Sequence, residues 1–205
     1  MVLAGVNGSG KSSSGGALLR RHGLSWFNPD MLATKLVGLG WSREDANGAA
    51  WSYGKRKLEE AMAERSDFAF ETTLGGTTMA SLLKAAAKTH DITMFFFGLA
   101  SVEQHVARVK LRVRYGGHDI PEPLIRARWA RSRENLVSLL PALSDLQLFD
   151  NSTEAAPGED IPAPKLVLDI RGGDVRWPKA DDREALEAVP DWAKPIVAAA
   201  LKLRQ

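Results

Sequence analysis

Short apolar runs alternate along this chain with longer stretches in which apolar residues recur at helical spacing. The runs lie at 2–5, 25–28, 68–70, 91–98 and 146–149. Such alternation is typical of βαβ units, in which helices join neighbouring parallel strands and cover the sheet. The pattern therefore predicts an α/β fold with a parallel sheet.

The stretches between these runs predict helices. They are expected at 10–22, from Pro29 onward, and at 43–65, 77–88, 101–114 and 121–137. Ser101 is a favourable N-cap, and Pro121 suits a first helical position. Between the last two helices, Tyr115-Gly116-Gly117-His118 breaks the periodicity and indicates a hinge.

The composition changes after residue 152. Residues 153–164 are rich in proline, alanine and acids, which indicates a loop. A strand is expected at 165–170, followed by a Gly-Gly-Asp turn and a return strand at 175–177. A helical tail, broken near Pro190 and Pro195, ends the sequence. We therefore expect a domain at 1–152 and a small strand-and-helix appendage at 153–205, packed on the same domain.

The first predicted strand runs into a complete G-x-x-x-x-G-K-[ST] motif, Gly5-Val6-Asn7-Gly8-Ser9-Gly10-Lys11-Ser12. A strand, a glycine-rich turn and a helix start are the context in which this motif binds phosphate. Main-chain amides and the positive end of the helix hold the anion there. Lys11 is expected at the β- and γ-phosphates, and Ser12 at Mg²⁺. The other positions assigned to nucleotide binding are Gly5, Asn7, Gly8, Ser9, Gly10 and Ser13. The alternative is a glycine-rich turn that caps an ordinary helix.

Composition narrows the range of functions. The 205 residues include no cysteine, which excludes disulfides, thiolate metal sites and cysteine nucleophiles. No apolar run reaches membrane-spanning length, and residues 1–20 lack the features of a signal peptide. We therefore expect a cytoplasmic protein without membrane contact.

Positive charge is concentrated in one segment, although the net charge is only +2. Eight lysines and arginines lie between residues 105 and 133, against two acids. Such a block can meet the phosphates of a nucleotide or of a nucleic acid.

Four polar residues follow predicted strands, where functional groups of an open α/β sheet gather. They are Asp30, Glu71, Thr73 and Asp150. Asp30 can accept the proton of an attacking hydroxyl, or it can be a first-turn helix acid. Glu71 can bind a substrate hydroxyl or a Mg²⁺-bound water, or end its strand in solvent. Thr73 can bind a substrate phosphate or hydroxyl, and Asp150 can be an outer Mg²⁺ acid or a turn former.

The basic segment has the layout of a mobile lid. Arg108 and Arg112 are four residues apart on one predicted helix, so they share a face. Beyond the Gly-Gly hinge, further arginines occupy the next helix, at 126, 128, 131 and 133. Arginines so placed can neutralise a transferred phosphoryl group, although any one of them can instead form a surface ion pair. His118 can bind substrate or make a hydrogen bond within the hinge.

Several short motifs occur in a fixed order over 1–152. Besides the 5–12 loop, they are Asn28-Pro29-Asp30, Glu71-Thr72-Thr73-Leu74, Arg112-Val113, Gly116-Gly117-His118-Asp119-Ile120-Pro121, Arg126-Ala127-Arg128-Trp129, Asn135-Leu136 and Asp150-Asn151-Ser152. In these residues the chain resembles the zeta-toxin family of P-loop kinases. The version of the lid resembles that of stand-alone chromosomal members.

The resemblance implies a P-loop NTPase fold with a nucleoside-kinase-like, parallel five-stranded sheet. It also implies ATP and Mg²⁺ as cofactors, transfer of the γ-phosphoryl group to a hydroxyl, and an antitoxin protein as a partner. In characterised toxins of this family the acceptor is the 3′-hydroxyl of the sugar of UDP-N-acetylglucosamine. By position, Asp30 matches the family's base, and Glu71 and Thr73 match its acceptor-binding strand end.

Two departures bear on the substrate. Plasmid-borne members often carry an arginine where this chain has Gly75, and their lid sequence differs. Among the arginines of the predicted lid, we favour Arg112 and Arg128 as catalytic residues, and we assign Arg108 and His118 to substrate binding.

The sequence thus predicts an ATP-dependent kinase that acts on a small hydroxyl-bearing molecule, with a UDP-sugar as one candidate. A nucleotide hydrolase or switch would keep Lys11 and Ser12 but would not need an acceptor pocket. A nucleic-acid-binding protein would use the 105–133 block, but no aromatic interleaving supports a nucleic-acid partner. A catalytically inactive scaffold is the remaining alternative.

Overall fold

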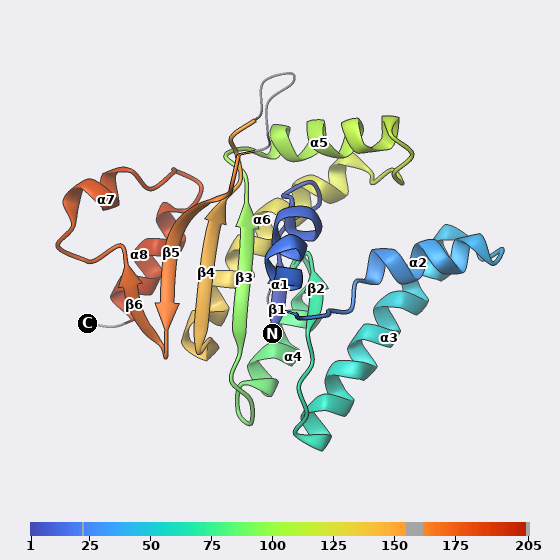
Figure 1. The fold of residues 1–205 in the computed structure, drawn as a ribbon, viewed down its shortest axis with the longest axis horizontal. Helices are drawn as coiled ribbons and strands as arrows, with labels where there is room; N and C mark the ends of the chain where they lie inside the picture. The colour runs from blue at the N-terminus through green and yellow to red at the C-terminus, as the bar shows by residue number, and fades with distance from the viewer. Residues whose placement is uncertain (22, 155–161, 204–205) are drawn as a thin grey trace.

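The computed structural model describes residues 1–21, 23–154 and 162–203 (Figure 1). Within these residues, six strands form one mixed sheet in the order β2-β1-β3-β4-β5-β6. The strands are β1 (Val2–Ala4), β2 (Phe70–Thr72), β3 (Thr93–Gly98), β4 (Asp145–Asp150), β5 (Lys165–Arg171) and β6 (Asp174–Trp177). The first four are parallel, whereas β5 and β6 run antiparallel to their neighbours.

The predicted all-parallel five-stranded sheet is therefore wrong in one strand. Segment 25–28 contributes only an isolated bridge between Phe27 and Phe70. Pairing stops there because Asn28 turns to cap the next helix, its Oδ1 accepting from the amides of Asp30 and Met31. Pro29 follows and has no N–H to donate to a ladder. The antiparallel hairpin expected after residue 165 is present and extends the same sheet.

Helices cover the sheet on both faces (Figure 1). They are α1 (Gly16–Arg21), α2 (Pro29–Gly38), α3 (Arg43–Glu64), α4 (Thr77–Ala86), α5 (Val102–Arg114), α6 (Glu122–Leu139), α7 (Arg183–Glu187) and α8 (Lys194–Lys202). A π-helical turn, Lys11–Gly15, precedes α1, and a 3₁₀ turn, Leu140–Ala142, follows α6.

The central strands β1 and β3 are largely buried on both faces, as parallel strands usually are. In β1, Val2 and Ala4 join the main core, which also contains residues of α4, α6 and α8. Leu3 faces the other way and packs with Leu19 of α1 and Phe97 of β3. The alternation of side chains along a strand thus places α1 and the loop before it opposite the main core.

Helices α2 and α3 form a hairpin at one side of the sheet (Figure 1). It has a small core of its own, in which Ala33, Ala46 and Ala50 are buried. The apolar side chains of Leu39 and Trp41, beyond the end of α2, remain exposed. The hairpin carries Asp30 at the start of α2, beside the end of the sheet.

The C-terminal segment contributes to the main core. Val167, Leu168 and Ile170 of β5 are buried there, as is Trp192. The Trp192 ring covers Gly98, where a side chain would collide with it, and Trp192 Nε1 donates to Asp150 Oδ1 at 3.1 Å. The domain boundary at residue 152 stays a prediction. Within the described part of the chain, no helix has both the length and the hydropathy to cross a lipid bilayer.

Candidate functional site

The 5–12 loop connects β1 to the π-helical turn and is fixed by its neighbours. Gly8 and Gly10 have φ angles of +83° and +84°, which favour glycine. A Cβ at Gly8 would also lie 2.9 Å from the carbonyl oxygen of His105. From the end of β4, Asn151 Nδ2 donates to Ser9 O at 2.9 Å. The loop is thus clamped between α5 and the carboxyl end of the sheet.

The helix that follows the loop begins without a side-chain cap. Gly10 occupies the N-cap position, and no side chain of the described residues accepts a hydrogen bond there. Ser9 Oγ is buried and has no hydrogen-bond partner among the described residues. First-turn amides without partners, at the positive end of a helix, are a typical anion-binding arrangement.

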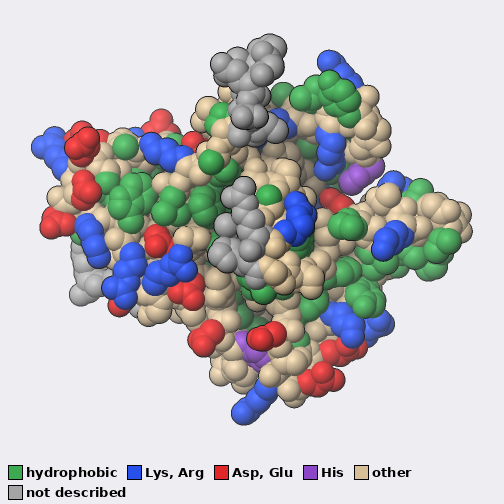
Figure 2. All heavy atoms as spheres, in the orientation of Figure 1, with side chains coloured by type: hydrophobic (Ala, Val, Ile, Leu, Met, Phe, Trp, Pro, Cys, Tyr) green, Lys and Arg blue, Asp and Glu red, His purple; other side chains and the backbone are tan. Residues whose placement is uncertain are grey.

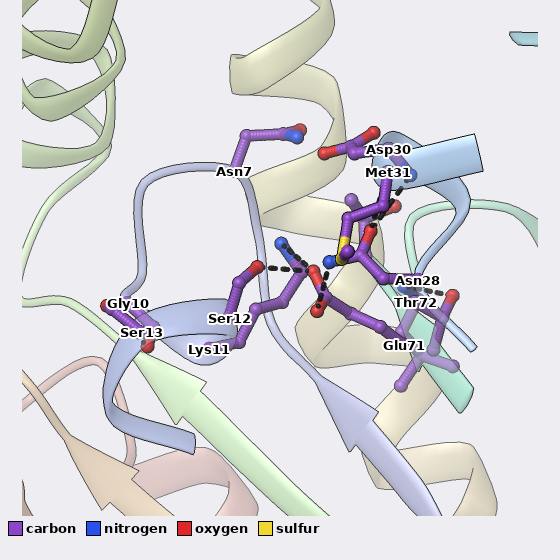
Figure 3. Close-up of polar contacts among 12 residues, drawn as sticks. Asn7, Gly10, Lys11, Ser12, Ser13, Asn28, Asp30, Met31, Glu71 and Thr72 are labelled. Atoms are coloured by element: carbon purple, nitrogen blue, oxygen red, sulfur yellow. Dashed lines mark hydrogen bonds and ion pairs between the residues drawn. The ribbon is translucent and has the colours of Figure 1, made fainter. Parts of the chain in front are cut away.

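Glu71 organises the other side of the loop (Figure 3). The parallel register pairs Leu3 with Glu71, so the end of β2 lies beside the start of the loop. Lys11 Nζ lies 3.3 Å from Glu71 Oε1, and the two side chains are only 7% and 3% exposed. Ser12 Oγ donates to the same oxygen at 2.7 Å. The Lys11–Glu71 ion pair is therefore a buried contact between the end of β2 and the loop.

The second carboxylate oxygen of Glu71 is also occupied. It accepts from Trp26 Nε1 at 3.3 Å and from Asn28 Nδ2 at 3.0 Å. A carboxylate offers about four acceptor positions, and here each oxygen accepts two contacts from the protein. Glu71 thus fixes Lys11 and Ser12, and its expected role in binding the acceptor stays a prediction. Neither Trp26 nor Asn28 stands out as a site residue in the sequence, because their contact with Glu71 depends on the long-range register.

A cavity of about 550 Å³ opens beside the loop and is called the first cavity below. Its lining includes three of the predicted catalytic residues, Lys11, Asp30 and Arg128, and three of the predicted substrate-binding residues, Glu71, Thr73 and His118. These residues thus lie close together, as expected from the meeting of strand ends at one edge of the sheet. Phe27 and the half-exposed Trp51 supply aromatic wall.

Positive and negative charges face each other across this cavity. Arg128 Nη1 donates to Asn7 Oδ1 of the loop at 2.7 Å. Burial lowers the pKa of Arg128, and the nearby charge of Asp30 opposes that shift. Burial likewise lowers the pKa of His118, again against Asp30. At neutral pH the cavity therefore holds a neutral imidazole and an arginine cation near the Asp30 carboxylate.

The other predicted arginines lie elsewhere. Arg112 donates from Nη2 to the carbonyl oxygen of His118 at 3.3 Å and packs on Gly117, outside both described cavities. It therefore holds the hinge, in this structure. Arg131, which the sequence does not single out, lines the first cavity. It follows Arg128 by three residues on α6, and this spacing was the available signal.

A second cavity, of about 1390 Å³, lies on the α5 side of the loop. Gly8, Gly10 and Ser13 line it, together with Arg108 and Asn151. Arg108 also donates to Thr153 O at 3.4 Å. The structure thus separates Arg108 from the acceptor-side residues with which the sequence groups it. Asp150 lines neither cavity and bonds to Ser152 and Trp192.

Known proteins match this chain at low sequence identity. No family model matches the sequence. An uncharacterised protein of Haemophilus influenzae is 26% identical over 137 residues, which are 63% of this chain and 91% of that protein. A chain in the crystal structure of AvrRxo1-ORF1:AvrRxo1-ORF2 with sulphate ions superposes with a TM-score of 0.64. The two chains share a fold.

This likeness is one of fold alone. The AvrRxo1 comparison gives 16% sequence identity and covers 94% of this chain. It covers 64% of the other chain, so the present sequence spans less than two thirds of that protein's length.

His105 of α5 supports the loop from below the surface. Its Nδ1 lies 2.9 Å from Asn7 O, and because a carbonyl oxygen only accepts, Nδ1 carries the proton in this contact. Burial lowers the pKa of His105 to about 4, and the nearby charge of Lys11 adds to the shift. The loop is therefore braced by a neutral histidine.

This histidine makes the stability of the fold depend on pH. An unfolded chain binds a proton at His105 below about pH 6.5, whereas the folded chain binds it only near pH 4. Its stabilising contribution is full above pH 6.5 and is lost as the pH falls toward 4, a loss of about 3 kcal/mol. Urea unfolding between pH 7 and 4.5 should show this decline. His105→Gln, which keeps a donor for Asn7 O, should flatten it, and an equal decline in both proteins would contradict the assignment.

Proposed function

We propose that this protein is an ATP-dependent kinase that transfers a γ-phosphoryl group to a hydroxyl of a small molecule. One observation carries the proposal: the 5–12 loop contributes lining residues to two cavities, and Lys11, Asp30 and Arg128 all line the first. A two-substrate transfer needs two sites that meet at one phosphate-binding element.

The residues around the loop fit ATP and Mg²⁺. The uncapped helix start and the buried, unbonded Ser9 hydroxyl suit a phosphate chain. Ser12 Oγ donates a hydrogen bond to Glu71, which leaves the lone pairs of the hydroxyl oxygen for Mg²⁺. The second cavity, beside Ser13 and Arg108, would take the nucleoside. When bound, the nucleotide would supply the phosphoryl group, and the metal would offset charge on it.

The first cavity would hold the acceptor. Asp30 would accept the proton of the acceptor hydroxyl, since it is fixed at the start of α2 by the Asn28 cap. Arg128 and Arg131 would neutralise negative charge on the transferred group and on the acceptor. Thr73 and the neutral His118 would orient the acceptor through hydrogen bonds.

The lining also suggests a class of acceptor. Aromatic wall from Phe27 and Trp51, together with two arginines, suits a molecule that has a planar ring and an anionic group. A UDP-sugar such as UDP-N-acetylglucosamine has both. Gly75 replaces the arginine common in plasmid-borne zeta toxins, so we propose that the acceptor differs from theirs in the groups near this residue.

A protein partner is part of the proposal. The structural neighbour was crystallised as a complex of two different chains, AvrRxo1-ORF1 and AvrRxo1-ORF2. We propose that a dedicated protein, in the manner of an antitoxin, binds this chain as well.

Several basic side chains of the 105–133 segment form ion pairs or stacking contacts within the protein, which weighs against a nucleic-acid ligand. Arg126 pairs with Glu103 and Glu122, and Lys110 with Glu122. Arg133 stacks on the Trp129 ring at 3.5 Å. In Figure 2, acidic and basic side chains are interspersed on the visible face. On this face, the mixed charges do not form the continuous basic surface on which non-specific nucleic-acid binding depends.

The deciding experiment is incubation with γ-labelled ATP and a panel of UDP-sugars, nucleosides and aminoglycosides. Mass spectrometry would then identify a product that carries one added phosphoryl group. We expect an acceptor-dependent product, and none with the Lys11→Ala variant. Release of inorganic phosphate at one rate with every acceptor, and no phosphorylated product, would instead establish a hydrolase.

A further inference from the structure

Side chains of helix α6 form hydrogen bonds with the backbone of the segment that follows β2. Ser132 Oγ donates to Thr73 O at 2.8 Å, and Asn135 Nδ2 donates to Leu74 O at 2.8 Å. Arg128 precedes Ser132 by four residues, so it lies on the same face of α6. The segment 73–76 therefore sets how closely the Arg128 stem approaches the first cavity.

The segment itself holds an uncommon conformation. Leu74 has a φ angle of +54°, which is unfavourable for a residue with a branched side chain. Its side chain is fully buried, and its amide donates to Thr72 Oγ1 at 3.0 Å. Backbone strain of this kind persists only where surrounding contacts enforce it. Here the bonds from α6 and the buried Leu74 side chain enforce it.

Gly75 leaves a space that the Arg128 side chain fills. A Cβ at position 75 would lie 2.6 Å from Arg128 Cγ and 3.1 Å from Arg128 Cβ. Real Cβ atoms do not approach other atoms this closely, so either the stem or the helix would have to move. At the next residue, Gly76, a Cβ would meet nothing within 4 Å. Position 75 thus requires glycine for space, and position 76 does not.

We propose that Gly75 is a positioning residue for Arg128. By lacking a side chain, it lets the Arg128 stem lie against the 73–76 segment and lets the guanidinium reach Asn7 Oδ1 in the loop. This inference rests on the proposed function, in which Arg128 neutralises the transferred phosphoryl group.

The test compares Gly75→Ser with its matched control, Gly76→Ser. In the ligand-free protein, the Nε–H signal of Arg128 in a ¹⁵N NMR spectrum, assigned with Arg128→Lys, should move in Gly75→Ser and stay in place in Gly76→Ser. An unchanged signal in Gly75→Ser would overturn the inference, and this readout needs neither ATP nor an acceptor.

Kinetics supply the second readout. We expect kcat to fall on the order of 10²-fold in Gly75→Ser, because a misplacement of about 1 Å can cost that much. The KM for ATP should change little. Combining Gly75→Ser with Arg128→Ala should cost no more than Arg128→Ala alone, whereas additive losses would overturn the positioning role. If the NMR signal shifts in Gly75→Ser but the wild-type protein has no transferase activity, the proposed function is overturned, whereas the positioning of Arg128 by Gly75 is supported.

Discussion

Replacing Lys11 with alanine is expected to abolish phosphoryl transfer while the fold is retained. Lys11 is a buried cation at the meeting point of the loop and the first cavity. Groups that neutralise charge on a transferred phosphoryl contribute on the order of 10³-fold or more to the rate. Turnover should fall by at least this factor, as measured by acceptor-dependent release of ADP.

The fold should survive because Glu71 keeps other donors. Without Lys11, its carboxylate still accepts from Ser12, Trp26 and Asn28. Far-UV circular dichroism and a thermal melt would check this, and Lys11→Met, which retains the aliphatic stem, is the second variant if alanine prevents folding. Lys57→Ala removes an exposed ion pair and is the control for loss of a lysine. Wild-type turnover in Lys11→Ala would refute the kinase proposal.

The parts of the site that the sequence predicts are those fixed by local pattern and topology. The 5–12 motif identifies a strand–loop–helix unit from adjacent residues alone. Asp30 and Thr73 are far from it in sequence, but both follow segments that pair at the sheet edge, so they can be placed beside it. These two residues line the first cavity with Lys11.

The errors arise where a local pattern meets a competing interaction. Segment 25–28 is apolar enough for a strand, but Asn28 and Pro29 suit the start of a helix better, and only Phe27 pairs. Glu71 lies at the end of a strand, as expected, but its hydrogen-bond partners are set by the register between β1 and β2. Periodicity contains no information on that register.

The roles of the lid arginines cannot be read from spacing because the direction of each helix after the hinge is a tertiary property. Arg112 and Arg128 are equally plausible in sequence, but the packing of Gly75 against α6 brings only Arg128 to the loop. The contact of Trp192 with Gly98 is likewise without a local signal. It joins residues separated by almost half the chain.

The second large effect is expected for Asp30→Asn, which should lower kcat roughly 10²- to 10⁴-fold with little loss of ATP affinity. The substitution preserves shape, and the Asn28 cap bonds to the backbone amide of residue 30 rather than to its side chain, so α2 should be unaffected. The base is lost, and with it the negative charge that raises the pKa of His118.

Two measurements separate this role from a general electrostatic one. Asp119→Asn is the matched control, because Asp119 also lines the first cavity and its Oδ1 accepts from Ile120 N at 2.9 Å, a bond that asparagine can keep. It should retain most of the activity. Since Asp30 opposes the effect of burial on His118, the pKa of His118 followed by NMR should fall further in Asp30→Asn, which reports on their proximity without any substrate. A variant with weakened ATP binding and intact turnover would show that Asp30 serves the nucleotide, and the assignment of Asp30 as the base would be wrong.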